Sequence, residues 1–188
     1  KEAGAEVIVG VEEAACRELN KKFFTFHEKR RPFITLKWAR SADGYLDRWR
    51  NSIDEAPAAR LSNDMTQIFV HRLRAQHSAI LVGHQTLLLD RPRLNLRAWA
   101  GTAPQPVVLG RVGEDALPAG WLAYADIDTL LAELHAKNFQ SLLVEGGART
   151  LQSFIDAGLW DEAYEELSPL ILDGGVPAPR LPRGVEEQ

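Results

Sequence analysis

The sequence is short of cysteine and of long apolar runs. Cys16 is the one cysteine among 188 residues. It excludes an internal disulfide framework or a cage of several thiolates, and such cysteine usage is typical of a reducing compartment. No apolar stretch reaches the roughly 18–20 residues that a membrane-spanning helix needs. We therefore expect a cytoplasmic protein that does not enter a membrane.

An excess of positive charge is also missing. The formal net charge is −4 at pH 7, and a field of this sign does not attract polyanions, so the composition argues against a nucleic-acid partner. Metal and nucleophile signatures are absent too. His71, His77 and His84 lack zinc-ligand spacing, and no G-x-S-x-G or Ser-His-Asp pattern occurs. We expect no metal site.

The sequence does contain an alternation of short apolar segments with stretches of helical periodicity. We predict strands at 6–9, 33–38, 79–82, 106–110 and 141–147, and helices at 11–31, 62–73, 127–138 and 148–159. This alternation predicts an α/β fold of parallel βαβ units, with helices on both faces of the sheet. The length fits one well-buried domain with a small appendage.

Some expectations rest on single residues. The first helix has an apolar stripe that runs from Val11 to Phe23 in steps of four. Ser62 is expected to cap the next helix, whose buried face would hold Met65, Ile68, Phe69 and Leu73. Segment 47–61 is interpreted as a surface loop or flap, and the tail after residue 167 is expected to hold one short strand.

Charged side chains gather where a predicted strand ends at Gly83. In open α/β sheets ligands bind beyond the carboxyl ends of the strands. We interpret 84–97 as a loop at that edge, with a hydroxyl, a carboxylate and guanidinium groups suited to phosphate at Thr86, Asp90, Arg93 and Arg97. The alternative is a solvated loop with ordinary surface salt bridges.

Two further candidates lie on other predicted strands. Glu145 precedes Gly146-Gly147 and a helix start, where backbone amides can approach a phosphate. Glu145 is either a structural carboxylate or an acceptor for the N–H groups of a heterocycle. Lys37 interrupts an apolar strand, and it either lies on a solvated face or holds a phosphate or an oxygen of a ligand.

Three motifs in this order resemble the reductase half of the RibD family of riboflavin biosynthesis. They are LKWARSADG, HRLRAQHSAILVGHQTLLLDRPRLNLR and LLVEGGARTLQSFIDAGLWDE. The resemblance covers nearly the whole chain. It implies a dihydrofolate-reductase-like fold with a mostly parallel central sheet, NADPH as cofactor, and a homodimer. The implied reaction reduces 5-amino-6-(5-phosphoribosylamino)uracil to the ribityl compound.

The resemblance also implies roles for single residues. Asp90 matches the family's acid between cofactor and sugar, and we expect it to be catalytic. The substrate-binding candidates are Arg74, Leu94, Arg97 and Glu145, to which the strand position adds Lys37. The cofactor-binding candidates are Ala39, Thr86, Asp90, Gly147, Ala148 and Thr150.

The same resemblance implies a division of the chain. Residues 1–31 are expected to be the end of a deaminase domain with a connecting helix, and 32–188 the reductase domain, with an unfinished C-terminal edge. The deaminase zinc signature is absent, so no deamination is expected. Ala58-Ala59-Arg60 stands where many relatives have Ser-x-Trp. Two alternatives stay open: a same-fold reductase of another pteridine or pyrimidine, and a non-catalytic domain that binds a nucleotide or supports a dimer.

Overall fold

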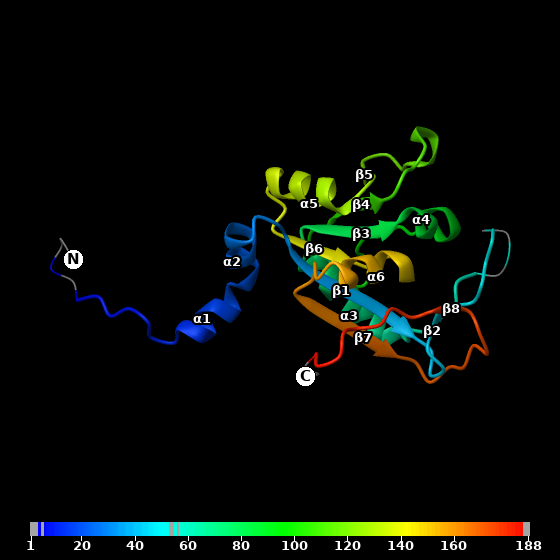
Figure 1. The fold of residues 1–188 in the computed structure, drawn as a ribbon, viewed down its shortest axis with the longest axis horizontal. Coiled ribbons are helices and arrows are strands. Elements are labelled where there is room, and N and C mark those ends of the chain that lie inside the picture. Colours follow the sequence, from blue (N-terminus) through cyan, green and yellow to red (C-terminus); the bar gives the residue numbers. More distant parts are fainter. Residues whose placement is uncertain (1–3, 5, 53–54, 56, 186–188) are drawn as a thin grey trace.

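A six-stranded parallel sheet forms the centre of the molecule (Figure 1). The computed structural model describes residue 4, residues 6–52, residue 55 and residues 57–185. The sheet order is β5-β4-β3-β6-β1-β7. Its strands are β1 (Phe33–Arg40), β3 (Ala79–Gly83), β4 (Gln105–Leu109), β5 (Leu122–Tyr124), β6 (Ser141–Val144) and β7 (Glu162–Leu167). A separate antiparallel pair is formed by β2 (Tyr45–Asp47) and β8 (Val176–Pro177). Since all six strands of the central sheet are parallel, the prediction of a mostly parallel sheet is confirmed.

Helices cover both faces of this sheet, as predicted. They are α1 (Glu13–Leu19), α2 (Lys21–Glu28), α3 (Asp64–Ala75), α4 (His84–Asp90), α5 (Ile127–Ala136) and α6 (Ala148–Asp156), with a 3-10 turn at Glu114–Ala116. α5 and α6 pack on one face, and the end of α3 packs on the other. None of the described helices is both long and apolar enough to cross a membrane.

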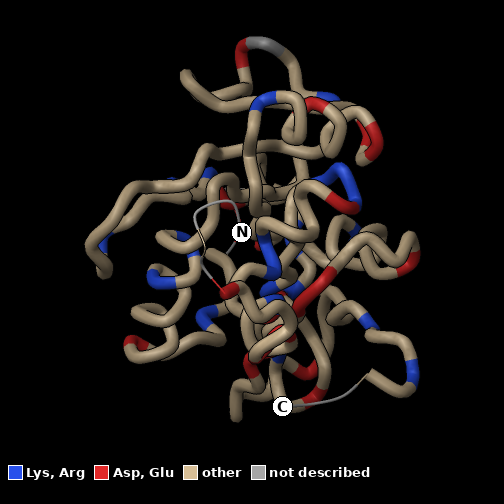
Figure 2. Tube along the Cα trace, turned by 90° about the vertical axis from the view of Figure 1, so that its left-hand side faces the viewer, with Lys and Arg blue, Asp and Glu red and all other residues tan. Residues whose placement is uncertain are grey.

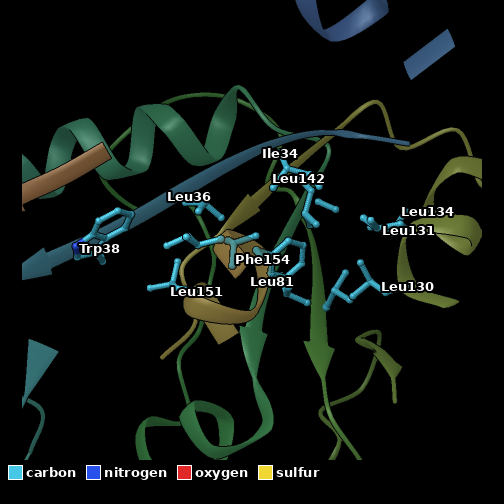
Figure 3. Packing of buried hydrophobic residues seen from close by; sticks show 14 residues of the cluster. Ile34, Leu36, Trp38, Leu81, Leu130, Leu131, Leu134, Leu142, Leu151 and Phe154 are labelled. Carbon is cyan, nitrogen blue, oxygen red and sulfur yellow. The ribbon is translucent and has the colours of Figure 1, made fainter. Parts of the chain in front are cut away.

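The main core lies between the sheet and the α5–α6 layer (Figure 3). Alternation along β1 sends Ile34, Leu36 and Trp38 to this face. They meet Leu130 of α5 and Phe154 of α6, which are both fully buried. Each such side chain contributes about 1.5–3 kcal/mol on burial. A smaller cluster on the opposite face joins Leu73, Ile80, Val82, Leu94 and Leu143.

A buried histidine sits on that opposite face. The Nδ1 atom of His77 lies 2.7 Å from the Leu73 carbonyl oxygen, and Nε2 lies 2.9 Å from the Thr35 hydroxyl. Since a carbonyl can only accept, Nδ1 carries the hydrogen and Nε2 accepts from Thr35. Burial, reinforced by the nearby charge of Lys22, lowers the pKa of His77 to about 4. The ring is therefore neutral in the folded protein at physiological pH.

Acid should consequently weaken the fold through His77. An unfolded histidine titrates near 6.5, so stability is fully present above that pH and falls as the pH drops from about 6.5 to about 4. The expected loss is about 3 kcal/mol. Urea unfolding of wild type and His77→Gln between pH 7.5 and 4 measures it, with exposed His27→Gln as control. Equal pH slopes for wild type and His77→Gln would contradict the prediction.

Several predictions near the N-terminus are wrong. Residues 6–9 form no strand, and the helix expected over 11–31 consists of α1 and α2. The stripe from Val11 to Phe23 is exposed, because no element of the described chain covers it. α2 instead buries Thr25 and Phe26. The first helix thus extends away from the sheet (Figure 1).

Two other expectations need correction. The cap of α3 is Asn63, whose side chain accepts from the Thr66 backbone N–H, and not Ser62. Only the C-terminal end of α3 packs on the sheet, so of the four apolar residues expected to be buried only Leu73 is; Met65, Ile68 and Phe69 are exposed. The tail does contain one short strand, β8, although β8 pairs with β2 and the last strand of the main sheet is β7.

Candidate functional site

Two adjoining cavities lie at the carboxyl edge of the sheet. The larger has a volume of about 600 Å³ and the smaller of about 290 Å³. Leu46, Ala59 and Glu145 line both. Because these residues form a common wall, two molecules that react with each other can bind side by side, one in each cavity.

The ends of β3 and β6 approach each other closely beneath the larger cavity. A Cβ atom on Gly146 would lie 2.7 Å from the Gly83 nitrogen and 3.0 Å from the Val82 Cα. The Gly147 N–H donates to the Thr86 hydroxyl at 3.1 Å, which ties the start of α6 to α4. Segment 84–90, which we expected to be a loop, is helix α4. The start of α6 and the length of α4 thus flank one cavity.

Most of the predicted cofactor residues meet in the larger cavity. Its lining includes Thr86, Asp90, Gly147, Ala148 and Thr150. Gly147 and Thr86 are 61 positions apart in sequence. The fold therefore brings two distant segments together in this cavity. Ala39, the sixth candidate, lines the smaller cavity instead.

Asp90 is held by an arginine that the sequence did not single out. Arg50 Nη2 donates to Asp90 Oδ1 at 2.6 Å and to Asp47 Oδ2 at 2.5 Å. Asp47 also accepts from the backbone N–H of Ala59 at 2.8 Å. Arg50 and Asp47 lie at the start of the segment interpreted as a flap, where only a general expectation of a functional loop pointed to them.

Lys37 lines the smaller cavity beside a second unpredicted acid. Lys37 Nζ lies 3.4 Å from Glu166 Oε2, and the Ser62 hydroxyl donates to the same oxygen at 2.6 Å. Burial alone would raise the pKa of Glu166, but the hydroxyls of Ser62 and Thr66, together with Lys37, lower it overall. Lys37 therefore lies at a cavity and not on a solvated face of the sheet.

Glu145 forms a closed pair with Arg74. Arg74 donates through Nε at 2.9 Å and through Nη2 at 2.6 Å, and both side chains are nearly buried. This bidentate geometry is the strong form of an ion pair. Glu145 still lines both cavities, whereas Arg74 lines neither.

The other predicted substrate residues lie outside the cavity linings. Leu94 is buried in the smaller core cluster with a positive φ of 49°. Arg97 is exposed, and its backbone N–H donates to His71 Nδ1 at 3.4 Å. Burial, and next the charge of Arg74, lowers the pKa of His71, so this acceptor is neutral at physiological pH. Neither position therefore lines the cavity that contains Asp90.

The site is built from paired charges. Basic and acidic positions are mixed along the trace in Figure 2, in keeping with the pairs described above. The described residues contain no group of three or more His, Cys, Asp or Glu that could hold a metal ion. The arrangement can orient a polar ligand through Asp90, Lys37 and Glu145, and it can bind phosphate at the start of α6.

Comparisons with known proteins agree on one family. The family described as "RibD C-terminal domain" matches residues 32–188. The riboflavin biosynthesis protein RibD of Aquifex aeolicus is 31% identical over 209 residues, covering 94% of this chain and 57% of that protein. The RibD of Corynebacterium ammoniagenes is 35% identical over 161 residues, with 78% and 46% covered. The chain spans about half the length of these curated relatives.

Solved structures agree on the fold. A Thermotoga maritima protein titled a diaminohydroxyphosphoribosylaminopyrimidine deaminase/5-amino-6-(5-phosphoribosylamino)uracil reductase superposes with a TM-score of 0.80 at 27% identity, covering 99% of this chain and 59% of that one. Dihydrofolate reductase from Enterococcus faecalis superposes with a TM-score of 0.56 at 17% identity, covering 79% and 78%. The dihydrofolate-reductase-like fold expected from the sequence is therefore confirmed.

Proposed function

The chain belongs to the RibD C-terminal domain family, and from this we propose that it is an NADPH-dependent reductase of riboflavin biosynthesis. The proposed reaction reduces 5-amino-6-(5-phosphoribosylamino)uracil to 5-amino-6-(5-phosphoribitylamino)uracil. The observation that carries the proposal is that Asp90 and the Gly147 turn line one cavity, next to a smaller cavity that contains Lys37. This arrangement suits a cofactor and a phosphorylated sugar side by side.

The residues of the larger cavity fit a nicotinamide dinucleotide. Gly147 lines the larger cavity and carries no side chain, so a ligand can approach its backbone closely. The free N–H groups at the start of α6, with Thr86, Ala148 and Thr150, would hold the phosphates. Ala39 would lie near the nicotinamide. When bound, the cofactor supplies a hydride.

The remaining chemistry belongs to the side chains of this protein. Asp90 would orient the sugar or transfer a proton during its reduction, because its carboxylate faces the cavity from the end of α4. Lys37 and Glu145 would hold the substrate in the smaller cavity. Arg74, Leu94 and Arg97 are proposed as further substrate-binding positions. The described residues of segment 47–61 that line the cavities, among them Arg50 and Ala59, would exclude water from the reacting carbon.

The test follows the absorbance of NADPH at about 340 nm after addition of the phosphoribosylamino-pyrimidine. We expect substrate-dependent oxidation, faster with NADPH than with NADH. Titration of NADPH fluorescence without substrate measures binding separately. Binding without oxidation would overturn the proposal in favour of a non-catalytic nucleotide-binding domain, and oxidation with another pteridine or pyrimidine alone would change the substrate.

Arg97→Ala is expected to weaken substrate binding more than turnover. A lost phosphate contact raises KM about tenfold or more while kcat changes little, since an interaction made equally in the ground and transition states is removed. Arg111→Ala serves as the matched control: Arg111, like Arg97, is exposed and lines neither cavity, but the family resemblance assigns it no contact with the substrate. An unchanged KM for Arg97→Ala would remove Arg97 from the substrate site.

A homodimer is part of the proposal. β7 is an edge strand, and apolar side chains on α3 and β7 are exposed beside it: Met65, Ile68, Phe69, Tyr164 and Leu167. The rings of Phe69 and Tyr164 lie 5.5 Å apart, so α3 and β7 present these two side chains on one surface, whereas Leu167 lies on the other face of β7. Analytical ultracentrifugation tests this proposal: we expect a dimer for wild type and a monomer for Phe69→Glu. A monomeric wild type would contradict it.

The remaining parts of the proposal concern context. Residues 1–31 would be the end of a deaminase half with its connecting helix, and residues 32–188 the reductase domain. The single cysteine supports a cytoplasmic location, because that usage is typical of a reducing compartment.

A further inference from the structure

We propose that Arg50 is a positioning residue, which fixes the Asp90 carboxylate in the wall of the larger cavity and affects the reaction through Asp90. The inference rests on the reductase activity proposed above. Arg50 belongs to the segment after β2 and lies 40 positions before Asp90 in sequence. Both side chains line the larger cavity.

Asp90 needs a compensating cation because of where it sits. It is the last residue of α4, where free carbonyl groups give the helix end a partial negative charge. α4 has no basic residue in its last turn. In the described part of the chain, the one ion pair formed by Asp90 is with Arg50, at 2.6 Å. Without Arg50 the carboxylate would be repelled from the position that the structure shows.

Arg50 is itself held in place from the other side. Its Nε and Nη2 donate to Asp47 Oδ2 at 2.9 Å and 2.5 Å, and its side chain is 6% exposed. Burial alone would lower the pKa of Arg50, but its bonds to Asp90 and Asp47 raise it, so Arg50 stays charged. Asp47 is fixed in turn by the Ala59 N–H. The guanidinium therefore has little freedom to move, and the Asp90 carboxylate bonded to it is held in a fixed position as well.

This arrangement predicts a specific kinetic effect. A misplaced carboxylate lowers the rate of the reacting step more than it weakens ligand binding. Loss of Arg50 should therefore reduce kcat and leave the KM for NADPH nearly unchanged. If Arg50 acts through Asp90, it can have no further effect once Asp90 has lost its charge.

The test is a double-mutant cycle of wild type, Arg50→Gln, Asp90→Asn and the double variant. We expect Arg50→Gln to lower kcat about tenfold or more in the wild-type background and less than about twofold in the Asp90→Asn background. Arg17→Gln is the matched control, because Arg17 also bridges two carboxylates, Glu13 and Glu28, but on the exposed surface of α1. Its kcat should equal that of wild type.

Two further measurements make the result decisive. Arg50→Lys keeps one charge and should recover part of the lost kcat, and it replaces Arg50→Gln if the latter does not fold. An unchanged kcat, or an equal loss in both backgrounds, would overturn the inference. If wild type does not oxidise NADPH with this substrate, the proposed function fails. The melting temperatures of the four proteins of the double-mutant cycle then test the Arg50–Asp90 contact without any activity. Additive decreases would show that Arg50 does not hold Asp90.

Discussion

Asp90→Asn is expected to lower the kcat of substrate-dependent NADPH oxidation by about 10²–10³-fold, with little change in NADPH affinity. The amide keeps the shape of the side chain but loses the charge that faces the cavity and Arg50. A neutral amide can neither accept a proton nor form a charge-assisted hydrogen bond of equal strength. Steady-state rates, with NADPH binding followed by fluorescence, separate the two quantities.

The control for this prediction is Asp156→Asn. Asp156 is the last residue of α6, as Asp90 is the last residue of α4, but it is exposed and lines neither cavity. The same chemical change at the same helical position should leave kcat unaltered. A wild-type kcat for Asp90→Asn would remove the catalytic role, and a loss of NADPH binding equal to the loss of kcat would make Asp90 a cofactor ligand only.

The central strands of the sheet were the most predictable part of the fold. All five residues of β3 and all four of β6 are buried, because helices or loops cover both faces there. Strands in that position consist of continuous apolar residues. Their order along the chain then places the residues that follow β3 and β6 at the same edge. This is why Thr86, Asp90 and Gly147 could be grouped from sequence.

The edge strand β7 gave no comparable signal. Its sequence is EAYEEL, with three acids and no apolar alternation. It forms a strand because β1 pairs with it and because its acids bond to β1 on both faces. Glu165 accepts from Trp38 Nε1 at 2.9 Å and from Arg40 Nε at 2.8 Å, while Glu166 lies near Lys37. These are tertiary contacts, which local patterns do not contain.

The same reason explains the site residues that were missed. Arg50 meets Asp90 across 40 positions and Lys37 meets Glu166 across 129. Neither Arg50 nor Glu166 belongs to a motif, and each lies in a segment without clear periodicity. Strand-end residues are placed by topology, which the alternation of elements reveals. Side chains that brace them from other segments are placed only by the finished fold.

Gly146→Ala should be among the most destabilising single substitutions in the site. Its Cβ would lie 2.7 Å from the Gly83 nitrogen, 3.0 Å from the Val82 Cα and 3.1 Å from the Val82 carbonyl carbon. All three are backbone atoms, and they cannot yield without separating the ends of β3 and β6. Just there the Glu145 N–H donates to the Leu81 carbonyl at 2.9 Å. We expect a loss of about 2–3 kcal/mol and a melting temperature lower by about 5–10 °C.

Two other glycines show whether the backbone contact is the cause. A Cβ on Gly147 would meet only the Thr86 hydroxyl, at 3.1 Å, and this side chain can rotate, so Gly147→Ala should cost less than Gly146→Ala. Gly113 has open space around it, and Gly113→Ala should leave the melting temperature nearly unchanged. Thermal melts of the three variants give the order. If Gly146→Ala and Gly113→Ala had the same melting temperature, the ends of β3 and β6 would lie farther apart than the structure shows. The close approach of these strand ends would then not be what holds Asp90 and the start of α6 around one cavity.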